Sequence, residues 1–131
     1  MKNLLVVTAV IEVGAGVALL GFPSATVGLL LGPPLHAPPP ATLVRSCGAV
    51  LLALGFACWL ASRDTGKPSA RRMVAVMTAY NLSAAAVLGM VGMRAPSVGI
   101  LLWPAVVLHA ATALWCAVRL FKVPWRSPEN L

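Results

Sequence analysis

The sequence predicts an all-α membrane protein, a four-transmembrane-helix bundle with one extra short helix. Hydrophobic residues make up 60% of the 131-residue chain, and the mean hydropathy is +0.90. These residues form four long runs that lack the alternation of a soluble amphipathic helix or strand. Each run has about the 20 residues that are needed to cross the hydrocarbon core of a bilayer. We therefore expect a single transmembrane domain over residues 1–131.

The positive residues divide unequally between the two ends of these runs. Of the 10 Lys and Arg residues, all except Arg45 and Arg94 fall on one side of a four-span arrangement. Segments rich in Lys and Arg are retained in the cytoplasm during insertion, so both termini are expected to be cytoplasmic. The charges lie at span ends without interleaved aromatic residues. The net charge of +7 is therefore interpreted as a topology signal and not as a nucleic-acid-binding surface.

The first span is expected over about 4–21, and it contains an acidic residue, Glu12. Lys2 and the apolar stretch after it resemble a secretory signal, but Glu12 interrupts the stretch and no Ala-x-Ala site follows. We interpret the segment as a retained span. The breaker Phe22–Pro23–Ser24 is followed by a short helix, about 24–31, which is expected on the outer side because it is too short to cross.

Three further spans follow a Pro-rich outer loop at 32–41. The loop should be stiff and extended because each Pro fixes φ and lacks a backbone donor. Pro104 lies early in the last span, where it is either tolerated or produces a kink. The expected segments after the loop are a span at about 42–61, a basic cytoplasmic loop at 62–71, spans at about 72–93 and 98–120, and a cytoplasmic tail at 121–131.

Small residues recur at a spacing of four along the second span, at Ala49, Ala53, Ala57 and Ala61. Residues four apart share one face of a helix. Helices in lipid associate largely through close approach at small residues. The row is expected to pack against another helix, either within the chain or between protomers of a homo-oligomer.

Glu12 is the main candidate for a functional residue. A charge at this depth costs at least about 2.5 kcal/mol, so polar neighbours must satisfy it or it must be protonated. At a rise of about 1.5 Å per residue, polar residues of the third and fourth spans reach a similar depth. The residues expected to turn toward Glu12 are Tyr80, Asn81, Ser83, His109 and Thr112.

Two interpretations of this group stay open. One is a hydrogen-bond network that holds the bundle together. The other is a functional site, because ionisable groups at this depth mark proton relays, ion paths or ligand contacts. In an enzyme, Glu12, His109 and Tyr80 would be catalytic, with Glu12 as acid or base. In a binding protein, Arg45 and Trp103 join the ligand contacts; Arg45 either snorkels to headgroups or clamps an acidic group.

No metal or cofactor is expected. Cys47, Cys58 and Cys116 lack Cys-x-x-Cys spacing and are interpreted as apolar packing residues. A bis-His haem would need His36 and His109 at one depth, whereas His36 falls in the outer loop. We therefore do not expect haem.

Three stretches of the chain have a familiar pattern: residues 45–61 (RSCGAVLLALGFACWLA), Tyr80–Asn81, and residues 102–110 (LWPAVVLHA). Together they resemble small uncharacterised bacterial four-transmembrane-helix proteins. The resemblance implies four helices in a bacterial inner membrane, and it implies no activity. The matching positions to mutate beside Glu12 are Arg45, Tyr80, Asn81, Trp103 and His109.

We expect a small polytopic inner-membrane protein that acts as a binding or accessory module. Its partners would be the lipid bilayer and either a lipophilic small molecule or partner membrane helices, with an intramembrane polar site around Glu12. One alternative is a membrane-embedded enzyme of the isomerase or cyclase type that transfers protons on a lipophilic substrate. Another is an oligomeric transporter or channel, since four spans are few for a carrier.

Overall fold

The computed structural model describes residues 1–32, 39–64 and 67–122, and the regular structure of these residues is helical. Four helices are long and apolar enough to cross a membrane, and a fifth is short. The prediction of a four-helix membrane bundle with an extra short helix is confirmed. The helices are α1 Lys2–Gly21, α2 Pro23–Leu31, α3 Ala41–Arg63, α4 Pro68–Arg94 and α5 Leu102–Lys122.

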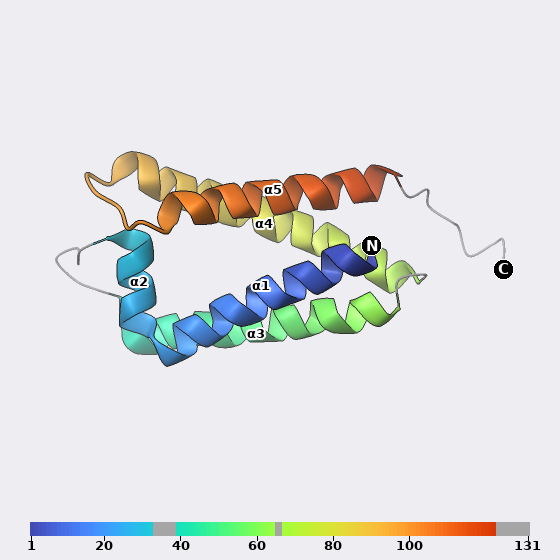
Figure 1. Ribbon diagram of the computed structural model, residues 1–131, viewed down its shortest axis with the longest axis horizontal. Helices are drawn as coiled ribbons and strands as arrows, with labels where there is room; N and C mark the ends of the chain where they lie inside the picture. Colours follow the sequence, from blue (N-terminus) through green and yellow to red (C-terminus); the bar gives the residue numbers. More distant parts are fainter. Residues whose placement is uncertain (33–38, 65–66, 123–131) are drawn as a thin grey trace.

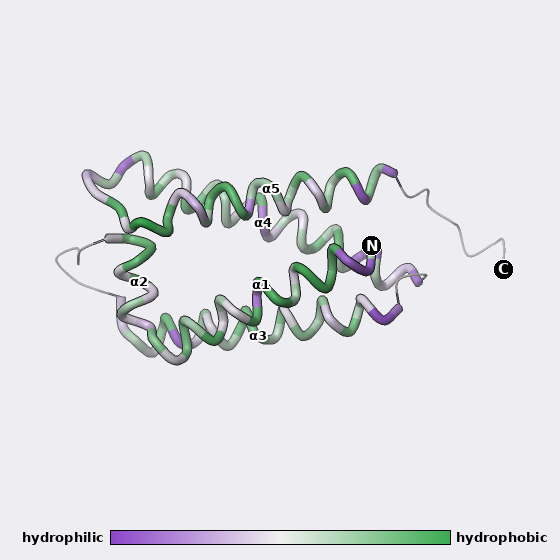
Figure 2. Tube along the Cα trace, viewed as in Figure 1, coloured by the Kyte–Doolittle hydropathy of each residue, from purple (hydrophilic) through white to green (hydrophobic). Residues whose placement is uncertain are grey.

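Several expectations from the sequence fall outside the described residues. They concern most of the Pro-rich loop with His36, part of the basic loop, and the tail after Lys122. Along the described helices, Figure 2 shows apolar residues over most of each length and hydrophilic residues mainly at the ends.

The long helices form two pairs, α1 with α3 and α4 with α5. Figure 1 shows the pairs close together where α1 begins, a region called here the N-terminal end. They diverge toward the opposite end, where α2 lies between them, and this region is called the α2 end. The short helix therefore occupies the space between the two diverging pairs.

The α1–α3 pair is held by direct contact between two backbones. A Cβ atom placed on Gly16 would lie 2.8 Å from the carbonyl oxygen of Gly48, and one placed on Gly48 would lie 2.8 Å from the oxygen of Gly16. Gly55 approaches the other half of α1, because its Cβ would lie 3.0 Å from the oxygen of Ala9. The absence of side chains at these glycines is what permits the close approach.

The row of alanines on α3 does not make this contact. Ala49 and Ala53 are exposed, and Ala57 and Ala61 are only partly buried, whereas Gly48 and Gly55 are buried. Of the two alternatives that were left open for this row, packing within the chain does not extend to Ala49 and Ala53. Glycine allows a closer approach than alanine, and this decides which face of α3 turns toward α1. Packing of the alanine row between protomers stays a prediction.

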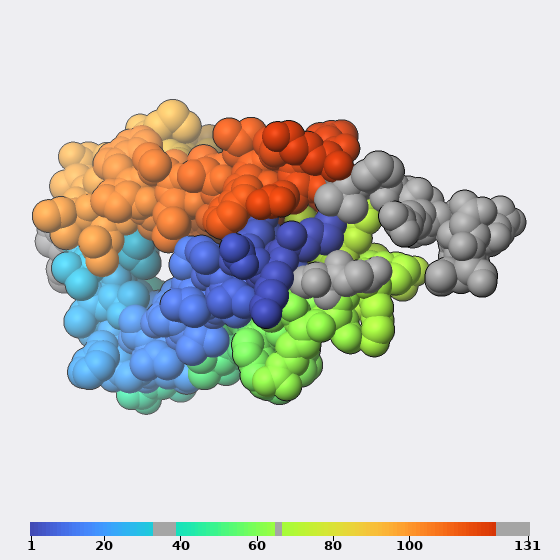
Figure 3. Space-filling model, turned by 45° about the vertical axis from the view of Figure 1, so that its right-hand side comes forward, coloured from blue at the N-terminus to red at the C-terminus, as the bar shows by residue number. Residues whose placement is uncertain are grey.

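The buried core lies at the N-terminal end and joins both pairs. Figure 3 shows the start of α1, in dark blue, between α5, in red, and the residues around the α3–α4 turn, in green. The side chains that are almost fully enclosed there are Leu4, Leu5, Cys58, Val74, Met77 and Cys116. The first turns of α1 therefore form the centre of the core and contact residues of α3, α4 and α5.

Two helices begin at prolines. Pro23 and Pro68 are the first residues of α2 and α4, so α4 starts earlier than its expected start near 72. Proline suits the first helical position, because its missing N–H would have no partner there and its φ is already helical. Pro104 is the third residue of α5, where the missing N–H again removes no helical hydrogen bond.

A backbone connection at the α2 end explains why α5 starts at Leu102 and not near 98. The amide of Gly99 donates to the carbonyl of Leu30 at 3.1 Å, and that of Leu101 donates to the carbonyl of Leu29 at 2.9 Å. The residues before α5 are thus bonded to the end of α2 instead of extending the helix. A Cβ on Gly99 would overlap the carbonyl of Leu29, so the approach requires glycine.

Candidate functional site

Glu12 lies inside the bundle, with 2% of its surface exposed. The hydroxyl of Tyr80 donates a hydrogen bond of 3.1 Å to its Oε2 atom. Because Glu12 is on α1 and Tyr80 is on α4, this bond crosses from one helix pair to the other. The Glu12 carboxyl group, which is costly to bury inside a membrane, therefore accepts a hydrogen bond from a residue of the opposite helix pair.

A second polar contact lies beside the first. His109 Nδ1, on α5, is 2.8 Å from Asn81 Oδ1, and Asn81 Nδ2 donates to the carbonyl of Met77 at 2.8 Å. Since the Asn81 amide nitrogen is the donor to Met77, its oxygen must accept from His109. A neutral His109 therefore carries its proton on Nδ1, and its Nε2 carries the lone pair.

The two contacts adjoin each other. The rings of Tyr80 and His109 meet edge to face, with centroids 5.8 Å apart and an interplanar angle of 83°. Glu12, Tyr80, Asn81 and His109 are named here the polar cluster. Tyr80 and Asn81 can form hydrogen bonds with different helices, because consecutive residues project about 100° apart around a helix axis. Tyr80 contacts α1, while Asn81 contacts α5.

Four of the expected ligand contacts lie apart from the polar cluster. Ser83 is exposed, since a residue two positions after Asn81 points to nearly the opposite side of α4. The Thr112 hydroxyl donates to the Leu108 carbonyl of its own helix. The remaining two are exposed and near the α2 end: Arg45, whose Nε donates to the Leu20 carbonyl at 3.3 Å, and Trp103.

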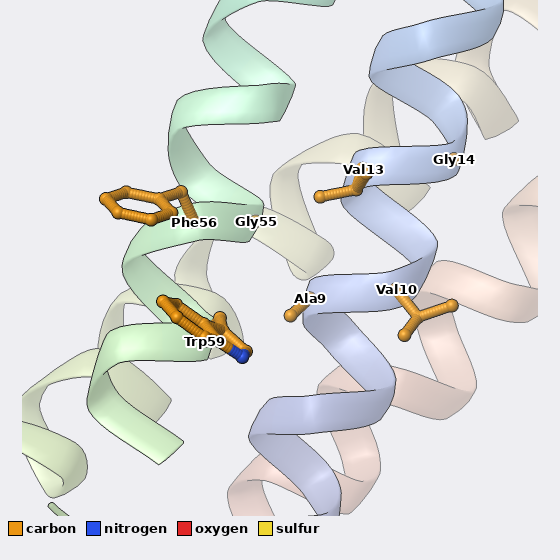
Figure 4. A pocket seen from close by; sticks show the side chains of 7 residues that line it. All are labelled: Ala9, Val10, Val13, Gly14, Gly55, Phe56 and Trp59. Atoms are coloured by element: carbon orange, nitrogen blue, oxygen red, sulfur yellow. The ribbon is translucent and has the colours of Figure 1, made fainter. Parts of the chain in front are cut away.

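The structure also shows a feature that the sequence analysis did not single out, an apolar groove between α1 and α3. Its volume is about 460 Å³. Figure 4 shows Ala9 and Val13 of α1 pointing toward α3, where Trp59 extends toward Ala9, whereas the ring of Phe56 points away from α1. Gly14 and Gly55 complete the lining, together with Val10. The sequence signal that could have indicated the groove was the pair of aromatic residues three apart on α3, Phe56 and Trp59, directly after Gly55.

An aromatic and cationic stack continues from this groove toward the N-terminal end. The rings of Phe56 and Trp59 stack with centroids 5.7 Å apart. The guanidinium carbon of Arg63 lies 3.9 Å from the centroid of the Trp59 ring. The groove therefore ends in a positive charge held over an indole ring.

Within residues 1–32, 39–64 and 67–122, no three His, Cys, Asp or Glu side chains gather at a point that could hold a metal ion. Cys58 and Cys116 are buried in the core at the N-terminal end as free thiols, and Cys47 is exposed. The expected absence of cofactors stays a prediction.

The four apolar helices define the class of this chain, a multi-pass membrane protein. Comparisons with models of protein families, with curated proteins and with solved structures gave no match. Its function is therefore argued from the polar cluster and the groove.

Proposed function

We propose that the chain is a membrane-embedded binding or accessory module that holds a lipophilic ligand or the helices of a partner protein. One observation carries the proposal. The polar cluster is hydrogen-bonded within itself across the two helix pairs, whereas the groove is lined by apolar side chains and lies on the outside of the α1–α3 pair. The cluster thus serves to hold the bundle together, and the groove is the surface that is free to bind.

The amount of apolar surface left uncovered supports this proposal. Of the residues in the apolar stretch of each span, 33% are buried in α1, 22% in α3, and 17% in each of α4 and α5. A bundle with so little internal packing presents most of its helix surfaces to lipid or to other helices. Small polytopic chains of this kind are suited to association through their helices.

We also propose the bacterial inner membrane as the location, with both termini in the cytoplasm. The distribution of Lys and Arg supports this orientation, because the positive ends of α1, α3, α4 and α5 lie together at the N-terminal end. Cysteine replacements at Asp64 and at Ser97, made in a chain without its native cysteines, test the orientation with a membrane-impermeant thiol reagent. Labelling of position 97 but not 64 from outside intact cells is expected, and the reverse pattern would refute the orientation.

Native mass spectrometry of the protein extracted in mild detergent tests the binding role. We expect peaks for the chain with a retained lipid, a second copy or a partner chain, at defined stoichiometry. Glu12→Gln should preserve those complexes, since the amide oxygen still accepts from Tyr80. A bare monomer in both samples, under conditions that retain lipids on a reference membrane protein, would contradict the proposal.

A proton-transfer enzyme is the second candidate, and one specific observation favours it. A carboxyl, a phenol and an imidazole adjoin one another between the helix pairs, and the Nε2 lone pair of His109 is the basic atom that such chemistry requires. The test is the conversion of a cellular lipid extract by reconstituted protein, followed by mass spectrometry. Loss of a product in Glu12→Gln, with complexes unchanged, would support the enzyme over the binding module. The transporter or channel stays a prediction.

A further inference from the structure

The apolar groove ends where a lipid headgroup would lie. Trp59 is at the N-terminal end of its lining, and Arg63 is one helical turn further, at the last residue of α3. α1 runs antiparallel to α3, because Gly16 meets Gly48 while Ala9 meets Gly55. The first residue of α1, Lys2, is therefore at the same end of the bundle as Arg63.

The carboxylates of the described segments do not neutralise these two cations. Asp64 forms an ion pair with Lys67 at 3.0 Å. Glu12 is hydrogen-bonded to Tyr80 deep in the bundle. Within the part of the chain that the structure describes, Lys2 and Arg63 therefore leave an uncompensated positive charge at the N-terminal end, on the side of Trp59 toward which the groove runs.

The groove lies within the depth of one leaflet from Arg63. Gly55 lies eight positions before Arg63, and at about 1.5 Å per residue this separation is about 12 Å. One leaflet of a hydrocarbon core of about 30 Å is about 15 Å thick. A molecule with its phosphate at Arg63 would thus have its acyl chain beside Trp59, Phe56 and Gly55.

We propose that this groove is a binding site for an anionic phospholipid of the leaflet at the N-terminal end. The acyl chain lies between α1 and α3, and the headgroup phosphate accepts hydrogen bonds from Arg63 with support from Lys2. Guanidinium groups bind phosphate through paired donors, and the Trp59 ring holds the guanidinium above the groove. The inference rests on the proposed binding role and names its ligand.

Fluorescence quenching by brominated lipids tests this site, because Trp59 lines it. A parent variant carries Trp103→Phe, Trp115→Phe and Trp125→Phe, so that Trp59 is the single fluorophore. It is reconstituted in phosphatidylcholine vesicles with increasing brominated-chain phosphatidylglycerol or brominated-chain phosphatidylcholine. We expect phosphatidylglycerol to reach half-maximal quenching at about fivefold lower mole fraction, the ratio that corresponds to about 1 kcal/mol for one cation at an anionic surface.

Two variants of the parent locate the headgroup and the chain. Arg63→Gln should remove the preference for phosphatidylglycerol, whereas the matched control Arg94→Gln, at the last residue of α4 at the opposite end, should keep it. Gly14→Leu should fill the groove and weaken quenching by both lipids. A Cβ at Gly14 meets no atom within 4 Å, and the same holds for its control Gly89→Leu on α4, which should quench like the parent.

Equal quenching by the two lipids in the parent, or an undiminished preference in Arg63→Gln, would overturn the lipid site. So would a dimer in native mass spectrometry that Gly14→Leu dissociates, because a second copy would then occupy the groove. If complexes persist in native mass spectrometry without any headgroup preference, the lipid assignment fails and the binding role stands. If complexes and preference are both absent, both proposals fail.

Discussion

The Tyr80 hydroxyl lies 3.1 Å from Oε2 of Glu12 and connects α4 to α1 across the boundary between the two helix pairs. A carboxyl group at this depth has no water to solvate it, so its donor must come from the protein. The bond thus explains how an acidic residue is accommodated in the first span. It also explains why a single tyrosine of α4 can couple the two pairs.

Tyr80→Phe should lower the free energy of unfolding by about 1–2 kcal/mol, because it leaves the buried Glu12 carboxyl without this donor. Titration with sodium dodecyl sulfate in mixed micelles measures the change. The matched control is Ser83→Ala, on the exposed side of the same helix, with an expected change within about 0.5 kcal/mol. Equal losses in the two variants would show that the Tyr80–Glu12 bond contributes nothing.

The neutral imidazole of His109 should be the Nδ1–H tautomer, because Asn81 Oδ1 can only accept. ¹⁵N NMR of histidine-labelled protein distinguishes the two ring nitrogens, and His36→Gln assigns the signals. In Asn81→Leu the Nδ1 acceptor is lost, so the Nδ1–H population should fall and the Nε2–H tautomer should appear. A spectrum unchanged by Asn81→Leu would disprove the contact.

Gly48→Ala should destabilise the α1–α3 pair by about 1–3 kcal/mol, since the added methyl would overlap the backbone of Gly16. Gly21→Ala is the control, because a Cβ at Gly21 meets no atom within 4 Å. The control should be neutral or slightly stabilising, as alanine is the better helix former. Thermal unfolding in detergent compares the two, and similar melting temperatures would count against the glycine contact.

Gly99→Ala should separate α2 from the start of α5, because its Cβ would overlap the Leu29 carbonyl. The amide of Leu101, which donates to that carbonyl, should then exchange its hydrogen faster. Hydrogen exchange with mass spectrometry of peptides covering Leu101 measures this. Gly28→Ala has open space for its methyl and should leave the exchange unaltered; protection that survives Gly99→Ala would contradict the backbone connection.

The number and approximate positions of the spans could be predicted because transfer of a helix into lipid depends on its summed apolar content. The depth of Glu12, Tyr80, Asn81 and His109 could also be estimated, since depth follows from counting residues along a helix. Helix starts were less predictable. α4 begins at Pro68, inside the segment 62–71 that was expected to be a loop, because proline is well suited to the first position of a helix.

The face of α3 that packs against α1 could not be predicted from the interval of four between its alanines. Ala49 and Ala53 have the regular interval of a contact strip, yet Gly48 and Gly55 meet α1, because the closest approach favours the residue without a side chain. Ser83 is at the right depth for the polar cluster but on the wrong side of α4.

Sequence by itself determined that this chain has four helices apolar enough to cross a membrane and a carboxyl group in the middle of the first one, since composition and counting suffice for both. Only the tertiary structure decided that Tyr80 forms a hydrogen bond with Glu12 while Asn81 forms one with His109. It also decided that an apolar groove lies between α1 and α3. The physical reason is rotation about each helix axis. Depth is a property of one helix, whereas orientation is set by contacts with its neighbours.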